Sequence, residues 1–175
     1  MAVMTPPRIF VASLVCLTLT ACSQPEPPVV NPGVENLDLA IRLTTIPNGL
    51  VVADNQGTSL ELRPTDETVG GVIWFAVGAE TVGVNLVAAV KEHETLIEGL
   101  PDGDYRGAQE LQGNFGTAFY SRGRFSDNGA LQEETHILLI HPTGNRLLTI
   151  GYRYPAGEDS AARVEQLIDV LTYIE

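Results

Sequence analysis

Residues 116–141 read GTAFYSRGRFSDNGALQEETHILLIH, two strand-like runs that meet at Asn128-Gly129. Asn-Gly is the preferred two-residue loop of a type I′ β-hairpin, because both loop positions need a positive φ. That loop sets a register in which Arg124 faces Glu133. Further from the loop, large apolar side chains occupy both faces of the hairpin. The sheet that contains it is therefore predicted to be covered on both sides.

Other strands and two helices are predicted around this hairpin from residue patterns and turn signals. The predicted strands are 39–45, 50–53, 59–63, 72–77, 105–111, 116–125, 131–141 and 146–154. The first helix begins after the N-cap Asn85 and ends at about Glu98, with an apolar stripe of Leu86, Val90, His93 and Ile97. The last helix covers about 160–173. This pattern predicts the α+β class, with an antiparallel β-sheet covered by two helices.

The element order is an early hairpin region, a helix, a four-strand antiparallel meander and a C-terminal helix. Together with the segment RLLTIGYRYP at residues 146–155, it resembles the PsbP/Mog1-type α/β/α sandwich of bacterial lipoproteins. Members of that group are mostly non-catalytic accessory or assembly proteins. They share no active site that could be assigned to residues of this chain.

The N-terminus reads as a secretory signal. Residues 9–21 form an apolar run of about 20 Å as a helix, short of the roughly 30 Å hydrocarbon core of a bilayer. The run ends in Leu19-Thr20-Ala21-Cys22, which resembles the lipobox of bacterial lipoproteins. The resemblance implies a diacylglycerol thioether on Cys22, cleavage before it and acylation of the new amine, with palmitate as the expected fatty acid.

Three segments follow from this interpretation: a signal peptide over 1–21, a proline-rich tether over 22–36 and one α+β domain over 37–175. Ser23 follows the lipidated cysteine, and by the enterobacterial sorting rule it directs a lipoprotein to the outer membrane. The expected location is extracytoplasmic, with the lipid in the outer membrane and the domain facing the periplasm.

The net charge of the chain limits the classes of partner that it can bind. The chain has 10 Lys and Arg against 22 Asp and Glu, a formal net charge of −12. Nucleic-acid binding is excluded, because contacts to phosphates need clustered basic residues. An acidic domain is also repelled by anionic headgroups, so the lipid on Cys22 is expected to provide the membrane attachment.

No motif of a common catalytic, nucleotide or metal site is present, and no catalytic residue, metal ligand or cofactor is predicted. His93-Glu94 begins like a zinc-protease motif, but Ile97 stands where the second histidine is needed. His93 is expected to be a buried core-edge residue. His136 and His141 should point to opposite faces of one strand. Ser121 should lie opposite His136, without the acid and oxyanion hole that a nucleophile needs.

Tyr120, Arg122 and Arg124 share one face of a strand and form a candidate patch for a protein partner or an anion. The preferred alternative is that these arginines neutralise nearby acids such as Glu133.

These expectations favour a lipid-anchored, non-catalytic binding module for another envelope protein. The alternatives are an envelope hydrolase with a loop-built site and a small-ligand carrier with a pocket between helix and sheet. An exposed apolar patch with an arginine rim would favour the binding module. A cleft with perturbed titratable groups would favour the enzyme, and a deep apolar pocket the carrier.

Overall fold

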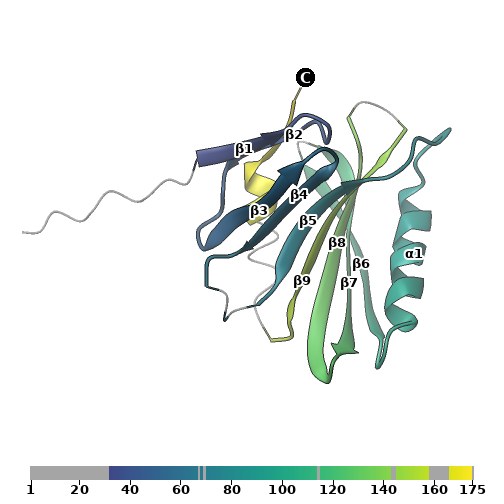
Figure 1. Cartoon of the computed structure of the whole chain (residues 1–175). Helices are drawn as coiled ribbons and strands as arrows, with labels where there is room; N and C mark the ends of the chain where they lie inside the picture. Colours follow the sequence, from purple (N-terminus) through teal and green to yellow (C-terminus); the bar gives the residue numbers. More distant parts are fainter. Residues whose placement is uncertain are drawn as a thin grey trace, which may run out of the picture.

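The computed structural model describes residues 32–66, 68, 70–113, 115–142, 145–157 and 166–174. The predicted signal peptide and Cys22 lie outside these residues, as does the beginning of the predicted last helix. In the part that is described, two β-sheets pack together and a long helix lies against the larger one (Figure 1). None of the described helices has the length and apolar character needed to cross a membrane.

The larger sheet has seven strands, and each neighbouring pair is antiparallel. In spatial order the strands are β3 (Leu50–Gln56), β4 (Ser59–Pro64), β5 (Val72–Val77), β9 (Leu147–Pro155), β8 (Ala130–Ile140), β7 (Gly116–Asp127) and β6 (Asp104–Gly113). The strands β6 to β9 form the predicted four-strand meander, and β9 joins it to β5. The predicted antiparallel sheet is confirmed.

The hairpin between β7 and β8 has the predicted loop and register. Asn128 and Gly129 have φ angles of 50° and 81°, as a type I′ turn requires. Arg124 pairs with Glu133 across the two strands. A single two-residue loop therefore determines which face of β7 and β8 each side chain occupies.

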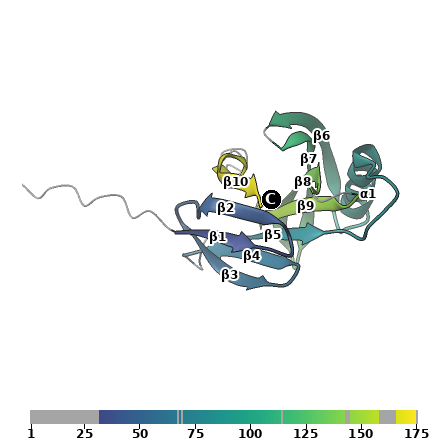
Figure 2. The same ribbon diagram turned by 90° about the horizontal axis from the view of Figure 1, so that it is seen from above.

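A three-stranded sheet covers the inner face of the large sheet. It consists of β1 (Pro32–Asn36), β2 (Ile41–Thr45) and β10 (Leu171–Tyr173), in the order β1-β2-β10. Figure 2 shows β2 and β10 on one side of the large sheet and α1 (Leu86–Glu98) on the other. The main core fills the space between the sheets and includes Leu39, Leu43, Leu62, Ile137, Ile150 and Leu167.

The last helix differs from its prediction. Within the described residues it covers only 166–170, and Leu171–Tyr173 form β10 instead of its final turn. β10 pairs with β2 through Leu171 opposite Leu43 and Tyr173 opposite Ile41. The free edge of β2 offers backbone groups that need partners, and this pairing outweighs the helical pattern of the segment. Within the described residues, the small sheet and residues 166–170 of the last helix cover the inner face together, and Leu167 of this helix belongs to the main core. Two helices are present as predicted, and the small sheet adds to the predicted cover.

The fold also includes the end of the predicted tether. Residues 32–36 form β1, which pairs with β2 through Val34 opposite Leu43. This segment was predicted to be part of the tether because of its proline and glycine, but a strand at the edge of a sheet tolerates these residues. Asn36 is buried, and its side chain joins β1 to the adjoining elements by donating to Asn55 Oδ1 (2.8 Å) and the Ser59 carbonyl (3.0 Å) and accepting from the Leu39 N–H (2.9 Å).

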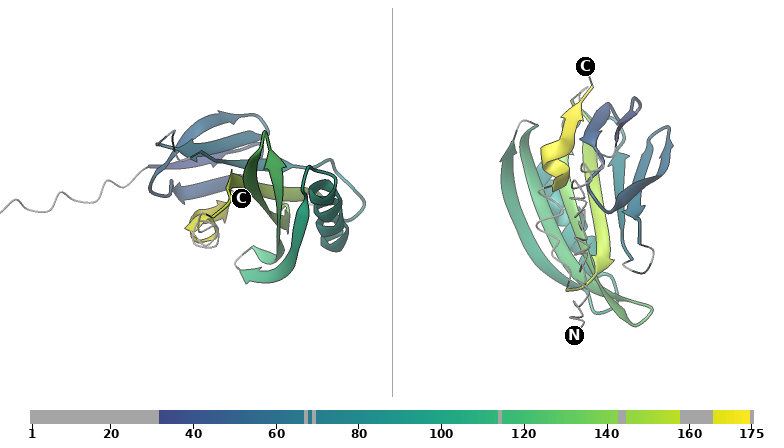
Figure 3. Two further views of the ribbon diagram at one scale, coloured as in Figure 1. Left: turned by 90° about the horizontal axis from the view of Figure 1, so that it is seen from below. Right: turned by 90° about the vertical axis from the view of Figure 1, so that its left-hand side faces the viewer.

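Helix α1 packs on the outer face of the large sheet, against β6, β7 and β8. Asn85 caps its N-terminus as predicted, because its side chain accepts a hydrogen bond from the Ala88 N–H. The buried stripe is Leu86, Ala89, His93 and Ile97, so Ala89 takes the place predicted for Val90, which is only half-buried. Figure 3 shows the strands β6 to β8 between α1 and the C-terminal segment. Among the described residues, no element packs over the outer face of β3, β4 and β5.

Candidate functional site

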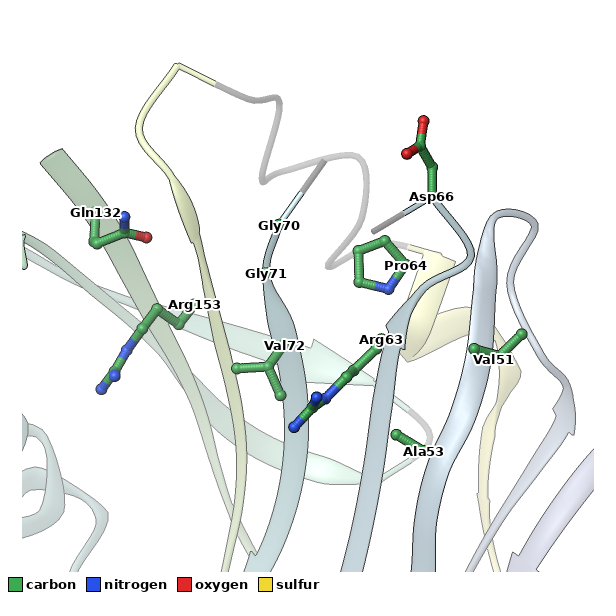
Figure 4. A pocket seen from close by; sticks show the side chains of 10 residues that line it. All are labelled: Val51, Ala53, Arg63, Pro64, Asp66, Gly70, Gly71, Val72, Gln132 and Arg153. Carbon is green, nitrogen blue, oxygen red and sulfur yellow. The ribbon is translucent and has the colours of Figure 1, made fainter. Parts of the chain in front are cut away.

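The uncovered part of the outer face is hollowed into a groove of about 620 Å³. The residues that line it come from β3, β4, β5, β8, β9 and the segment between β4 and β5 (Figure 4); they are Val51, Ala53, Arg63, Pro64, Asp66, Gly70, Gly71, Val72, Gln132 and Arg153. Val51 is 47% exposed, although it is a large apolar side chain. The groove therefore combines accessible apolar surface with charged groups.

Two arginines extend along this groove. Arg63 on β4 and Arg153 on β9 lie on either side of Val72, which belongs to β5 between them (Figure 4). The Arg63 guanidinium pairs with the partly exposed Glu61 carboxylate on its own strand. A pair of guanidinium groups over apolar side chains suits a carboxylate-bearing ligand.

Arg153 is held in place from two directions. Its Nε donates to Glu134 Oε2 at 2.7 Å, and a terminal nitrogen of the guanidinium lies 2.7 Å from the same oxygen. The guanidinium also lies over the rings of Phe125 and Trp74, at 5.2 and 5.9 Å from their centroids. The groove thus has one pre-oriented arginine, Arg153, and one more exposed arginine, Arg63.

Trp74 of β5 sits at the border between the groove and the part of the sheet under α1. Its ring lies over Gly151 of β9, where a Cβ would come within 2.0 Å of the indole. The ring then meets His136 of β8 edge-on, with the centroids 5.8 Å apart. A row of side chains runs from here under α1.

Beneath α1 the row becomes a buried polar cluster. His93 of α1 stacks on His136, with ring centroids 3.8 Å apart and an interplanar angle of 16°. Its Nδ1 forms a hydrogen bond with Ser121 Oγ at 2.8 Å, and that hydroxyl also bonds to Tyr105 Oη at 3.0 Å. His136 Nε2 lies 2.9 Å from Glu134 Oε1. Helix and sheet are thus joined through hydrogen-bonded and stacked polar groups.

Burial dominates the electrostatics of this cluster. It lowers the pKa of His93 from 6.5 to about 4, with help from the neighbouring His136 and against the attraction of the Glu134 carboxylate. Burial alone would raise the pKa of Glu134, but hydrogen bonds from His136 and Arg153 and their charges keep it below its ordinary value. At neutral pH the cluster therefore holds a neutral His93 beside an ionised Glu134.

Ser121, His93 and Glu134 follow the order of a nucleophile, a base and an acid, but their geometry does not suit nucleophilic catalysis. Ser121 is completely buried, and its hydroxyl is shared with Tyr105. His93 Nε2 is 4.0 Å from Glu134 Oε1, beyond hydrogen-bond range. None of the three lines the groove. The arrangement is a packed polar cluster rather than an accessible catalytic triad.

The predicted patch of Tyr120, Arg122 and Arg124 lies on the face of β7 opposite to α1. Tyr120 packs against the main core, and Arg124 donates to Glu133 Oε2 at 2.9 Å. Arg122 is exposed. The predicted neutralisation of an acid is confirmed for Arg124, and the patch as a binding site stays a prediction. Cys22, the predicted lipid attachment site, lies outside the described residues.

The sequence predicted correctly that His93 lies on α1 and His136 on β8, but it did not predict that the two side chains are in contact. It predicted Ser121 opposite His136, and the register confirms this pairing. Knowing that α1 packs over β7 and β8 would have added His93 to that pair. His141 does not join them, because its Nε2 bonds to the Leu39 carbonyl oxygen at 2.9 Å in a buried position.

No family model matches this chain, and no curated protein matches it in sequence. Solved structures do share its fold. The Ran-binding protein Mog1p of Saccharomyces cerevisiae aligns with a TM-score of 0.57 and 16% identity, over 83% of this chain and 96% of that one. LpqN of Mycobacterium tuberculosis, described as involved in cell envelope biogenesis, aligns with 0.56 and 14%, over 77% and 83%.

A structure from Bacteroides thetaiotaomicron VPI-5482 aligns with a TM-score of 0.59 and 15% identity, over 83% of this chain and 49% of that chain. At these identities the likeness establishes the fold. The chain has a Mog1-like α+β fold with a mostly antiparallel sheet, as the resemblance in the sequence predicted.

Proposed function

We propose that this protein is an envelope lipoprotein, anchored through Cys22, whose domain binds another envelope protein without catalysing a reaction. The groove on the outer face is the proposed docking site. The partner segment is an extended stretch with acidic side chains. Arg63 and Arg153 are each paired with one carboxylate of this chain, and their further N–H donors above an apolar floor would bind the carboxylates of the partner.

The observation that carries this proposal is the combination of exposed Val51 with the arginines at the edge of the groove. An apolar surface with an arginine rim is typical of a protein-binding patch. A carrier for a small apolar ligand would need a deeper, more uniformly apolar pocket. The hydrolase alternative has no support from the cluster under α1, where Ser121 is inaccessible.

Two neighbours in fold agree with this class of function by their names alone. One is called a Ran-binding protein and the other is described as involved in cell envelope biogenesis. The resemblance of residues 19–22 to a lipobox supports anchoring, since a lipid would hold an acidic domain at a surface that its charge does not favour.

Site-specific photo-crosslinking in the native host tests the docking site. A photoreactive residue replaces Val51 in the groove, and a matched control replaces Leu96 on α1; these residues are 47% and 49% exposed. We expect one envelope protein to crosslink at position 51 and not at position 96. The same crosslink should weaken in an Arg63→Glu variant and persist in Arg106→Glu, whose arginine lies on β6 and pairs with Asp104. Equal crosslinking at both positions, or no effect of Arg63→Glu, would overturn the docking site.

Metabolic labelling with a fatty acid tests the anchor separately. The wild-type protein should incorporate label and begin at Cys22 after processing, whereas Cys22→Ser should do neither. An unlabelled wild-type protein would overturn the anchor and leave the groove proposal to its own test.

A further inference from the structure

Three potential metal ligands converge beneath α1. His93, Glu134 and His136 each offer one ligand atom, and these atoms all lie within 4.8 Å of one another. Both imidazoles present Nε2 near one carboxylate oxygen, Glu134 Oε1, at 4.0 Å for His93 and 2.9 Å for His136. Two imidazole nitrogens and one carboxylate oxygen form a donor set that suits Zn²⁺ and related divalent ions.

One of these ligand atoms lacks a partner. His93 is 3% exposed, and its Nε2 is buried without a hydrogen bond in the described structure. The other ring nitrogen, Nδ1, bonds to Ser121. Leaving a buried imidazole nitrogen unpaired is unfavourable, because the group has lost its hydrogen bonds to water without gaining others. The cluster is therefore incomplete as protein alone. A bound cation would complete it, with Ser121 Oγ accepting a hydrogen bond from the Nδ1–H of His93.

The surrounding groups orient the ligands as outer-shell partners do in metal sites. Ser121 would fix the tautomer and ring position of His93. Arg153 binds Glu134 through Oε2, which leaves Oε1 directed at the two histidines. A carboxylate held in this way serves as a ligand through one oxygen.

We infer that His93, Glu134 and His136 bind a single Zn²⁺ or a divalent ion of similar preference. The ion would replace the hydrogen bond between His136 and Glu134. The two imidazole rings, which are stacked in the structure, would tilt out of the stack so that both Nε2 lone pairs point at the ion, and each ligand atom would then lie at the about 2.0–2.2 Å typical of zinc. A fourth position would be left for water. Because His93 lies on α1 and the other two ligands on β8, the ion would tie the helix to the sheet.

An ion can reach this site from the outer face. The His136 side chain is 14% exposed, whereas those of His93 and Glu134 are 1% exposed. His136 borders Trp74 and therefore the side of the groove. The site does not depend on the proposed docking function, but an ion there would lie next to Arg153, which lines the groove.

The test is direct metal binding by the full-length protein purified in detergent and stripped with a chelator. Titration with Zn²⁺ in a calorimeter should give one site per chain, and Co²⁺ should give a visible absorption band without the intense charge-transfer band of a thiolate ligand. Zn²⁺ should also raise the unfolding temperature, because it binds only the folded site. Absence of stoichiometric binding would overturn the inference.

His136→Gln is the principal variant. His136 is the most accessible ligand, so its replacement should disturb the packing of the fold least. We expect the affinity of this variant for Zn²⁺ to fall by more than the roughly 10–100-fold that is typical of changes to outer-shell partners. His93→Gln is the second variant, and circular dichroism checks that both fold. Glu133→Gln is the matched control, because Glu133 pairs with Arg124 on the opposite face. Binding that survives in both histidine variants, or is lost equally in the control, would overturn the site.

Discussion

The indole of Trp74 lies over the backbone of Gly151, and a Cβ at that glycine would come within 2.0 Å of the ring. Trp74 on β5 and Gly151 on β9 are direct neighbours in the register of the sheet. The missing side chain lets the indole lie flat across β9 and reach the edge of His136. This single close approach connects the groove to the histidine cluster under α1.

Replacing Gly151 with Ala should therefore displace Trp74. Trp74 is the single tryptophan of the chain, so its fluorescence reports the change directly. We expect a red-shifted emission and a loss of about 1–3 kcal/mol in the free energy of unfolding, as in other overpacked sites. Gly83→Ala is the control, because a Cβ there meets no atom within 4 Å. An unchanged spectrum in Gly151→Ala would contradict the described position of Trp74.

Gly129 should tolerate a β-branched residue poorly. Its φ of 81° lies in the left-handed region, so Gly129→Val is expected to lower the free energy of unfolding by about 1–2 kcal/mol. Urea denaturation measures the change. Gly83→Val again serves as the control, since Gly83 is exposed and is not among the glycines with positive φ. Equal stability of the two variants would speak against the type I′ turn.

Asn36 should be essential to the position of β1. Asn36→Ala removes three hydrogen bonds and leaves the buried N–H of Leu39 unpaired, which predicts a loss of about 1–3 kcal/mol in unfolding free energy. Thermal or urea unfolding measures it. Asn145→Ala is a suitable control, because Asn145 is exposed and its described bonds use only its backbone carbonyl. If the two variants were equally stable, residues 32–36 would behave as a tether after all.

Tyr173 should make the fold sensitive to alkaline pH. Burial raises its pKa to about 12 from the ordinary 10, and its hydroxyl has no hydrogen-bond partner in the described part of the chain. The unfolded chain therefore releases this proton first, and stability present below pH 10 is lost as the pH rises toward 12. Tyr173→Phe should change the free energy of unfolding by less than about 1 kcal/mol at pH 7. Above pH 10 this variant should not show the loss of stability that ionisation of Tyr173 causes in the wild-type protein. Parallel pH profiles of the two proteins would contradict the burial of the hydroxyl.

The local sequence was sufficient to predict an element wherever neighbouring residues determine its conformation and no distant segment pairs with it. Asn128-Gly129 specified the hairpin and its register, and Asn85 specified the start of α1. The prediction from local sequence was wrong where pairing with the edge of a strand far away in the chain determined the conformation. Leu171–Tyr173 continue a helical pattern but pair with β2, and Pro32–Asn36 look like a tether but complete the same sheet.

The sequence by itself thus determined the α+β class, the antiparallel meander and the faces on which its side chains lie, because periodicity and turn residues act over a few positions. Only the tertiary structure decided that His93 meets Glu134 and His136, since their contact depends on where α1 docks. It also decided that Arg63 and Arg153 share a groove, because α1 leaves that part of the sheet open. Contacts between elements far apart in the chain depend on the packing of whole faces, and no local pattern encodes them.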